Sequence, residues 1–241
     1  MASPPLSSIL IVGSGVFGLS AAYALSHRPA YSHTKITVLD RSPFPSPDGS
    51  SIDTSRIIRA DYSDPAYASL ASAAQEEWRK QGKDDLGGEG RYTESGLVLV
   101  ADKGVQGEHY VRESYVNVLK LMSDSGDKDA VQRLDSREMI EEAASTGGGS
   151  GVWGYVNRRS GWADAEAGMV WLREQVEKTG RVHFVYAEVE SLLKSQDNKK
   201  VLGVKLKNGE EMHADLTVRI VIPFLPGPGL FLNRSILLNR S

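Results

Sequence analysis

The clearest pattern of apolar positions lies at the start of the chain. Residues 9–12 are four consecutive apolar residues that run into a glycine-rich turn, which is typical of a strand buried on both faces of a parallel sheet. The next stretch is rich in good helix formers, with Leu19, Ala22 and Leu25 placed to face a sheet. A second stretch, ITVLD at residues 36–40, has apolar residues at 36, 38 and 39 and ends in an aspartate. The pattern therefore predicts a strand, a helix and a second strand in succession.

The middle of the chain mixes helical and strand patterns. Asp64 precedes Pro65, which predicts a helix N-cap with proline at the first helical position, and Gly82 is the predicted end of that helix. Residues 42–55 are rich in Pro, Ser, Asp and Gly and predict a loop. The remaining expected elements are a strand at 93–101, a helix at about 108–122 and a short helix opened by a capping box of Asp135 and Glu138.

The last third predicts one more helix and a run of strands. Asp164 is the expected N-cap of a helix that ends at Gly180. The expected strands are 182–186, 188–193, 201–206, 210–214 and 216–218, with Asn208 and Gly209 forming a hairpin turn. Strands and helices alternate at the start of the chain, and an antiparallel meander follows later. This order indicates an α/β protein with an inserted segment that departs from the alternating pattern. No internal repeat of domain size is visible.

Composition narrows the class of protein. The 241 residues carry a net charge of −3, which favours neither nucleic acid nor an acidic membrane surface as a partner. There are no cysteines, which excludes disulfides and thiolate metal sites, and the five histidines have no ligand spacing, so we expect no metal. The longest apolar run, at 220–232, is short and interrupted by proline and glycine, and the N-terminus lacks a basic signal region. We therefore expect an intracellular protein without a membrane span.

The glycine-rich turn carries the first chemical signal. Gly13, Gly15 and Gly18 have GxGxxG spacing, and Asp40 ends the second predicted strand. In such a unit the glycines allow a sharp turn, close approach of a pyrophosphate and tight helix packing, while the acidic residue accepts hydrogen bonds from a ribose. A chance glycine-rich loop is the alternative, but the strand, helix and acidic residue all stand in the required places. The unit serves NAD and FAD alike, and this pattern alone leaves the two open.

Longer segments resemble one family. They are GSGVFGLSAAYAL at 13–25, ITVLDR at 36–41, SSIDTSRIIRADYSDPAYASLA at 50–71, ESGLVLVA at 94–101 and SGWADAEAGMVWL at 160–172. Together they resemble the FAD-dependent amine oxidases of the D-amino-acid-oxidase superfamily, in particular the fungal fructosyl amino acid, saccharopine and pipecolate oxidases and monomeric sarcosine oxidase. The resemblance covers residues 8–218 in register. It implies a Rossmann-like FAD-binding domain with a mixed sheet and, at about 85–160, part of a second, antiparallel substrate domain.

The resemblance also implies roles for single residues. Arg59 resembles the arginine that grips a substrate carboxylate, and Arg56 would lie near the flavin; we take both as catalytic candidates. Without the family, either arginine could simply pair with Asp53 or Asp61. The residues expected to bind FAD are Gly13, Ser14, Gly15, Val16, Phe17, Gly18, Asp40, Arg41, Ser51, Thr54, Ser55, Arg56 and Val189.

The implied reaction is oxidation of the C–N bond of a secondary amine or N-substituted amino acid of fructosyl, saccharopine, pipecolate or sarcosine type. The flavin carries the redox chemistry, and O₂ reoxidises it to give H₂O₂. We expect a monomer in the cytoplasm or the peroxisome, although the chain has no peroxisomal signal at its C-terminus. The alternatives are an NAD-dependent dehydrogenase, or a catalytically dead fragment or binding module.

The resemblance stops at residue 218. Residues 219–241 contain the tetrapeptide LNRS twice and lack the small-residue turn that follows this strand in the family. We expect this tail to lie outside the family pattern. The family's later lysine and cysteine have no counterpart either, so we expect the chain to bind FAD weakly or not at all and to have little oxidase activity.

Overall fold

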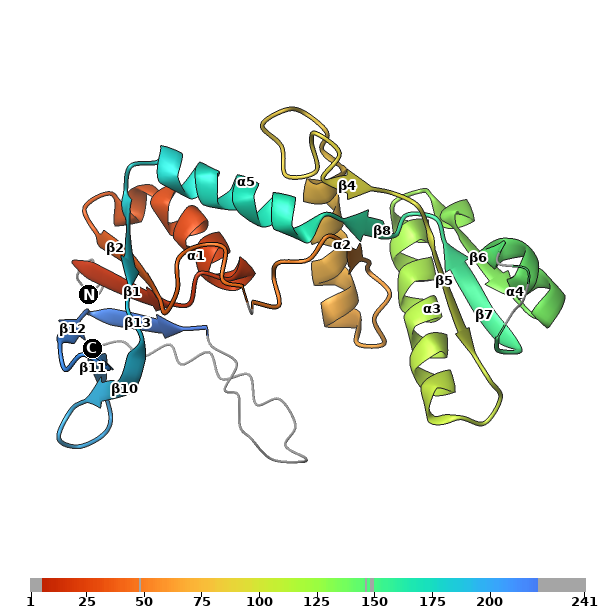
Figure 1. The fold of residues 1–241 in the computed structure, drawn as a ribbon. Helices are drawn as coiled ribbons and strands as arrows, with labels where there is room; N and C mark the ends of the chain where they lie inside the picture. The colour runs from red at the N-terminus through yellow and green to blue at the C-terminus, as the bar shows by residue number, and fades with distance from the viewer. Residues whose placement is uncertain (1–5, 48, 146, 148–149, 221–241) are drawn as a thin grey trace. The chain divides into compact units, whose positions relative to one another are not determined.

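A computed structural model describes residues 6–47, 49–145, 147 and 150–220 (Figure 1). The tail expected at 219–241, with both LNRS tetrapeptides, lies outside the described residues from position 221 onward. Contacts divide the chain into two units, the first formed by Met1–Ile52 and Met169–Ser241 and the second by Asp53–Gly168. The expected insertion at 85–160 falls within the second unit, and its assignment to a substrate domain stays a prediction.

The first unit is built on a parallel sheet. Its strand order is β13 (Leu216–Arg219), β1 (Ser8–Val12), β2 (Lys35–Asp40) and β9 (Val182–Tyr186), and every neighbouring pair is parallel. From β1 the chain passes through helix α1 (Val16–Ser26) to β2 on one side, whereas β13 pairs on the other. The strand order therefore reverses at β1, and ligands of open α/β sheets bind outside the carboxyl ends of the strands at such a point.

Both faces of this sheet are covered, which explains the continuous apolar run in β1. Ile9 and Ile11 pack with residues of α1 and of α5 (Ala165–Lys178). Leu10 and Val12, which point the other way, pack against a three-stranded antiparallel sheet. That sheet is the expected meander, made of β10 (Val189–Lys194), β11 (Val201–Leu206) and β12 (Glu211–His213).

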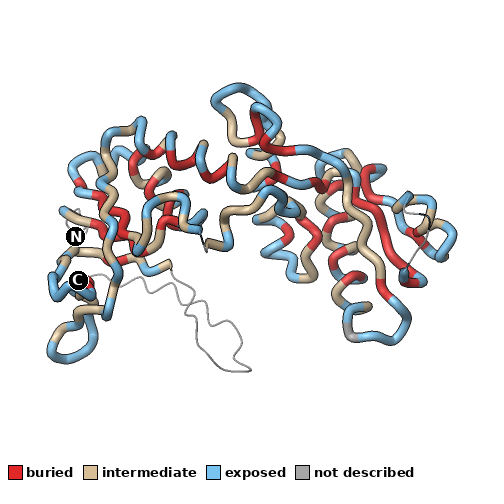
Figure 2. The backbone as a smooth tube through the Cα atoms, in the orientation of Figure 1, coloured by how far each residue is buried: buried red, intermediate tan, exposed pale blue. Residues whose placement is uncertain are grey.

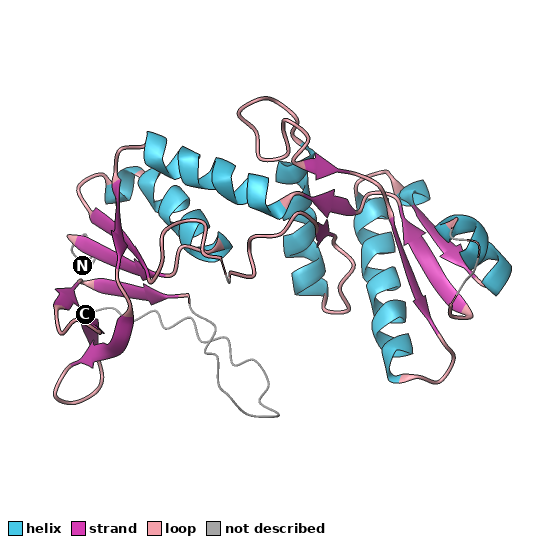
Figure 3. Ribbon diagram, viewed as in Figure 1, coloured by secondary structure: helices cyan, strands magenta, loops and turns pink. Residues whose placement is uncertain are grey.

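Within its described residues, the second unit contains two antiparallel sheets of three strands and three complete α-helices (Figure 3). One sheet has the order β5 (Leu97–Ala101), β7 (Trp153–Asn157) and β6 (Val131–Leu134), and the other β3 (Arg56–Ile58), β8 (Gly161–Ala163) and β4 (Tyr92–Thr93). The helices are α2 (Pro65–Arg79), α3 (Gln106–Asp124) and α4 (Arg137–Ala144). Buried residues of α3 and of the first sheet form one core, which is visible as red segments in Figure 2.

The predicted α/β class is confirmed, and most predicted element ends are close to the observed ones. Asp64 caps α2 by accepting from the backbone N–H groups of Ala66 and Tyr67, and Asp164 accepts from Ala167 at the start of α5. However, α2 ends at Arg79, before Gly82, because Lys80 takes an extended conformation.

The predicted capping box at Asp135 was wrong by one residue. Ser136 is the N-cap of α4, where its hydroxyl accepts from the backbone of Met139. The carboxylate of Asp135 instead pairs with Arg133 at 2.6 Å. Ser136 has the extended backbone of an N-cap residue, with φ of −142° and ψ of 162°, so the helix starts one residue later than predicted.

In the described part of the chain, no helix combines the length and the apolar character that crossing a membrane requires.

Candidate functional site

The glycine-rich turn joins β1 to α1 closely. Gly13 has φ of +108°, a conformation that side chains disfavour, and its N–H donates to the carbonyl of Leu39 at 2.8 Å. A Cβ added to Gly18 would lie 1.8 Å from the carbonyl oxygen of Gly13. The helix therefore meets the end of the strand backbone to backbone, as the spacing of the glycines predicted.

The first turn of α1 offers unpaired donors. Gly15 is the N-cap, no side chain caps the helix, and the first turn carries no acidic residue. The N–H of Val16 donates to the hydroxyl of Ser51 at 3.3 Å. Within the described residues, the N–H groups of Phe17 and Gly18 have no acceptor, and the side chains of Val16 and Phe17 are exposed. Such a helix end attracts anions through its N–H groups and its dipole.

Asp40 lies beside this turn. Its Oδ2 accepts from the backbone N–H of Ser14 at 2.6 Å and from the Ser14 hydroxyl at 2.7 Å. In the described part of the chain Oδ1 has no donor, so it remains available to a hydroxyl group of a ligand. Gly13, Ser14, Gly15, Gly18 and Asp40 are thus brought together at the carboxyl ends of β1 and β2.

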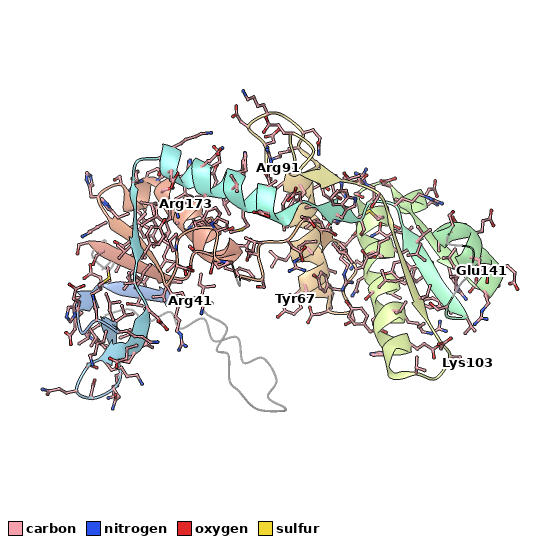
Figure 4. The ribbon with its side chains drawn as sticks, viewed as in Figure 1. Arg41, Tyr67, Arg91, Lys103, Glu141 and Arg173 are labelled. Atoms are coloured by element: carbon pink, nitrogen blue, oxygen red, sulfur yellow. The ribbon has the colours of Figure 1, made fainter. Side chains whose placement is uncertain are left out.

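The other predicted contacts of the first unit lie around this group. Ser51 reaches α1 through Val16, and Val189 packs, half-buried, on the sheet face that contains Leu10 and Val12. Two residues before Val189, the N–H of Ala187 donates to the carbonyl of Asp40 at 2.8 Å. Arg41, which is exposed and labelled in Figure 4, follows directly after β2.

Four predicted residues belong to the second unit. Thr54, Ser55 and Arg56 are exposed at the start of β3, and Arg59 is partly buried just after that strand. Arg56 forms an ion pair of 2.9 Å with Asp53, so one of the alternative pairings considered for the two arginines is present.

Arg59 has aromatic surroundings. Its guanidinium carbon lies 4.7 Å from the ring centroid of Tyr62 and 5.9 Å from that of Tyr110. One guanidinium nitrogen donates to the Tyr110 hydroxyl at 3.0 Å, and another donates to the backbone carbonyl of Asp61. In the described part of the chain no carboxylate pairs with Arg59, unlike Arg56. A guanidinium held between rings with its charge unpaired can bind a carboxylate.

Sequence reasoning missed a buried polar cluster next to Arg59. The carboxylate of Asp61 accepts hydrogen bonds from Tyr155, Asn157 and Ser160, and all four side chains are fully buried. Burial, together with the nearby Asp61 carboxylate, raises the pKa of the Tyr155 hydroxyl well above its usual value, so it stays a donor. The three donors lie more than 90 residues from Asp61, and no local spacing signals them.

Among the described residues, no group of three or more His, Cys, Asp or Glu side chains is arranged to hold a metal ion.

Comparisons with known proteins identify the family of this chain. A family model described as FAD dependent oxidoreductase matches residues 8–222. The chain is 37% identical to amino acid oxidase fsqB of Aspergillus fumigatus, over 88% of this chain and 48% of that protein. It is 34% identical to amino acid oxidase imqH of Aspergillus flavus, over 89% of this chain and 51% of that protein.

A third curated relative is L-saccharopine oxidase of Schizosaccharomyces pombe, 28% identical over 95% of this chain and 53% of that protein. Among solved structures, the chain is similar to fructosamine oxidase (Amadoriase II) of Aspergillus fumigatus, with a TM-score of 0.65 and 25% identity over 92% of this chain and 50% of that one. The chain thus spans about half the length of the curated relatives it matches.

Proposed function

Because the chain belongs to the family of FAD dependent oxidoreductases, we propose that it takes part in oxidising the C–N bond of an amino acid that carries a secondary amine. Family membership favours FAD over NAD, the alternative that the glycine pattern left open. Four substrate types fit the proposal: fructosyl amino acids, saccharopine, pipecolate and sarcosine. Each has a carboxylate close to a secondary amine, so one guanidinium could hold all of them.

The observation that carries the proposal is that two kinds of group lie at the same edge of the parallel sheet. They are N–H groups without an acceptor in the described part of the chain, and a carboxylate with one oxygen that accepts no hydrogen bond there. The N–H groups of Phe17 and Gly18 would bind the pyrophosphate of FAD, and Oδ1 of Asp40 would accept from its adenosine ribose. Ser14 orients Asp40 by donating twice to the other carboxylate oxygen. Ser51 and Val189 would contribute from the loop and the strand beside this edge.

The second unit would supply the substrate contact. Arg59 would bind the substrate carboxylate, while Tyr62 and Tyr110 hold the guanidinium in place through their rings. Thr54, Ser55 and Arg56, with Arg41 from the first unit, are proposed as further flavin contacts. The chemistry that bound FAD would supply is the two-electron oxidation of the amine carbon, with O₂ as the electron acceptor and H₂O₂ as the product.

A titration tests the cofactor site. We expect the affinity of the purified chain for FAD to be low, as proposed for a chain that lacks the later part of the family pattern. ADP and FAD should nevertheless bind through the same residues, and AMP at least tenfold more weakly than ADP, because AMP lacks the pyrophosphate. Calorimetry measures all three affinities, and Asp40→Ala should weaken them together. Equal binding of AMP and ADP, or no effect of Asp40→Ala in a folded variant, would contradict the proposed site.

A second assay tests the reaction. With FAD added, formation of H₂O₂ is measured for sarcosine, L-pipecolate, L-saccharopine and a fructosyl amino acid. Peroxide formation that depends on the amine supports an oxidase. A chain that binds FAD and forms no peroxide with any of them would favour the alternative, a binding module without catalysis. The expectations of a monomer and of a cytoplasmic or peroxisomal location stay predictions.

A further inference from the structure

The charge of Arg59 stays unpaired although a carboxylate is close to it in the sequence. Arg59 donates to the backbone carbonyl of Asp61 and to the hydroxyl of Tyr110, which are both neutral groups. The carboxylate of Asp61 belongs to the same residue as that carbonyl, and the two residues are only two positions apart in the sequence. In water or in a loose loop, such a pair would be expected to form an ion pair.

Three neutral donors hold this carboxylate elsewhere. Oδ1 of Asp61 accepts from the hydroxyl of Tyr155 at 2.9 Å, and Oδ2 accepts from the hydroxyl of Ser160 at 2.6 Å. Nδ2 of Asn157 lies 3.2 Å from both oxygens. All four residues are fully buried, and a buried carboxylate costs several kcal/mol unless such donors surround it.

The backbone around Arg59 is fixed at the same time. Gln75, only 1% exposed, donates from Nε2 to the carbonyl of Ile58 at 3.1 Å and to that of Arg159 at 3.2 Å. The residue before Arg59 and the residue two positions after it are therefore both tied to the turn at 157–160. The backbone that carries Arg59 is thus held on both sides.

We propose that Tyr155, Asn157 and Ser160 keep the carboxylate of Asp61 from neutralising Arg59, and thereby leave Arg59 free to bind the carboxylate of a ligand. The proposal rests on the function proposed for Arg59 above and assigns positioning residues to it. None of the three donors touches the ligand. A buried carboxylate that accepts enough hydrogen bonds from neutral donors is stable without an ion pair. A carboxylate that loses those donors is stabilised by pairing with the nearest cation.

The test uses sodium acetate as the carboxylate probe and the 241-residue chain itself. Nuclear magnetic resonance of the arginine Nε–H groups reports binding, at constant ionic strength kept with sodium chloride. The Arg59 signal is assigned by its loss in Arg59→Lys. We expect acetate to shift this signal in the wild type, and the double variant Tyr155→Phe with Ser160→Ala to bind acetate at least tenfold more weakly.

A third substitution distinguishes competition by the Asp61 carboxylate from a general loosening of the loop. Adding Asp61→Asn to the double variant removes the competing carboxylate, so acetate affinity should recover to within about threefold of wild type. A loosened loop would not recover. Tyr92→Phe is the matched control, because it deletes a tyrosine hydroxyl of the same unit that contacts Arg159 and not Asp61. If the double variant does not fold, Ser160→Ala alone, with and without Asp61→Asn, carries the same comparison.

The outcomes distinguish this inference from the proposed function. Normal acetate binding by the double variant, or no recovery on adding Asp61→Asn, overturns the role of the three donors while Arg59 keeps its own. A wild-type Arg59 signal that does not respond to acetate overturns the proposed role of Arg59 and the inference together.

Discussion

A methyl group added at Gly18 should damage the protein in a different way from one added at Gly15. At Gly18 the new Cβ would lie 1.8 Å from the carbonyl oxygen and 2.9 Å from the carbonyl carbon of Gly13. Both are backbone atoms that no rotamer change can remove. Since separations below 3.0 Å do not occur for real Cβ atoms, α1 would have to withdraw from β1 by more than about 1 Å.

At Gly15 the situation is the opposite. Its φ of −68° suits any residue, and the nearest atom to a new Cβ is the hydroxyl oxygen of Ser51 at 3.4 Å, an ordinary contact. The methyl group would instead stand where a pyrophosphate approaches the backbone. Gly15→Ala should therefore leave folding intact and weaken ADP binding.

The magnitudes follow from these distances. Overpacking of a closely packed site costs about 1–3 kcal/mol, and Gly18→Ala should reach the upper end because only backbone can yield. Gly15→Ala should change the free energy of unfolding by less than about 0.5 kcal/mol, as ordinary surface substitutions do. Gly107→Ala is the control: it lies in α3 with nothing within 4 Å of its new Cβ, so it should stabilise by up to about 1 kcal/mol.

Urea denaturation measures the free energy of unfolding, and calorimetric titration with ADP measures binding. If Gly18→Ala unfolds at the urea concentration of the wild type, α1 and β1 do not meet as described. If Gly15→Ala is destabilised as much as Gly18→Ala, the effect of Gly15 on binding cannot be separate from an effect on folding, which contradicts the role given to it.

Three further predictions concern stability, each checked by urea denaturation of the single variant. Hydrogen bonds from the hydroxyl and backbone of Ser7 lower the pKa of Asp215 in the folded protein. The ionised carboxylate therefore adds stability above about pH 3.8, and this stability is lost as the pH falls through the lowered pKa. Asp215→Asn should destabilise the protein at pH 7, and the difference from the wild type should vanish at low pH. Asp64→Ala removes the N-cap of α2 and should cost about 1 kcal/mol, and no loss would contradict the cap. Ser136→Ala should cost a similar amount, whereas Asp135→Ala should cost less than about 0.5 kcal/mol, because only the serine caps α4.

The first unit could be predicted from local sequence because each of its elements carries its own signal. A strand buried on both faces is apolar at every position, and β1 is. The hairpin at Asn208 and Gly209 likewise identified the meander. The place of β13 beside β1 could not be predicted in this way, since it depends on a pairing across about 200 residues that no local pattern encodes.

The strands β3, β4, β6, β7 and β8 were not predicted as such. β7 is buried at every residue but contains Gly154, which ordinarily weakens a strand, and it follows a glycine-rich stretch that indicates a loop. The glycine is needed because a Cβ there would lie 2.3 Å from the carbonyl oxygen of Leu99 on β5. Gly154 thus makes β7 hard to predict from the sequence and at the same time allows β7 to lie close to β5.

Arg56 and Arg59 show when the spacing of charged residues in the sequence predicts an ion pair and when it does not. Arg56 and Asp53 are three residues apart, their side chains both reach solvent, and they form an ion pair of 2.9 Å. Arg59 and Asp61 are only two residues apart, yet their side chains have different partners, since the acid is buried among donors from 94 to 99 residues away. Closeness in sequence predicts an ion pair between two exposed side chains, but not between side chains that the tertiary fold supplies with other partners. For a buried side chain the partners are set by the tertiary fold. Arg59, which has no carboxylate partner among the described residues, is the arginine proposed to bind the carboxylate of a ligand.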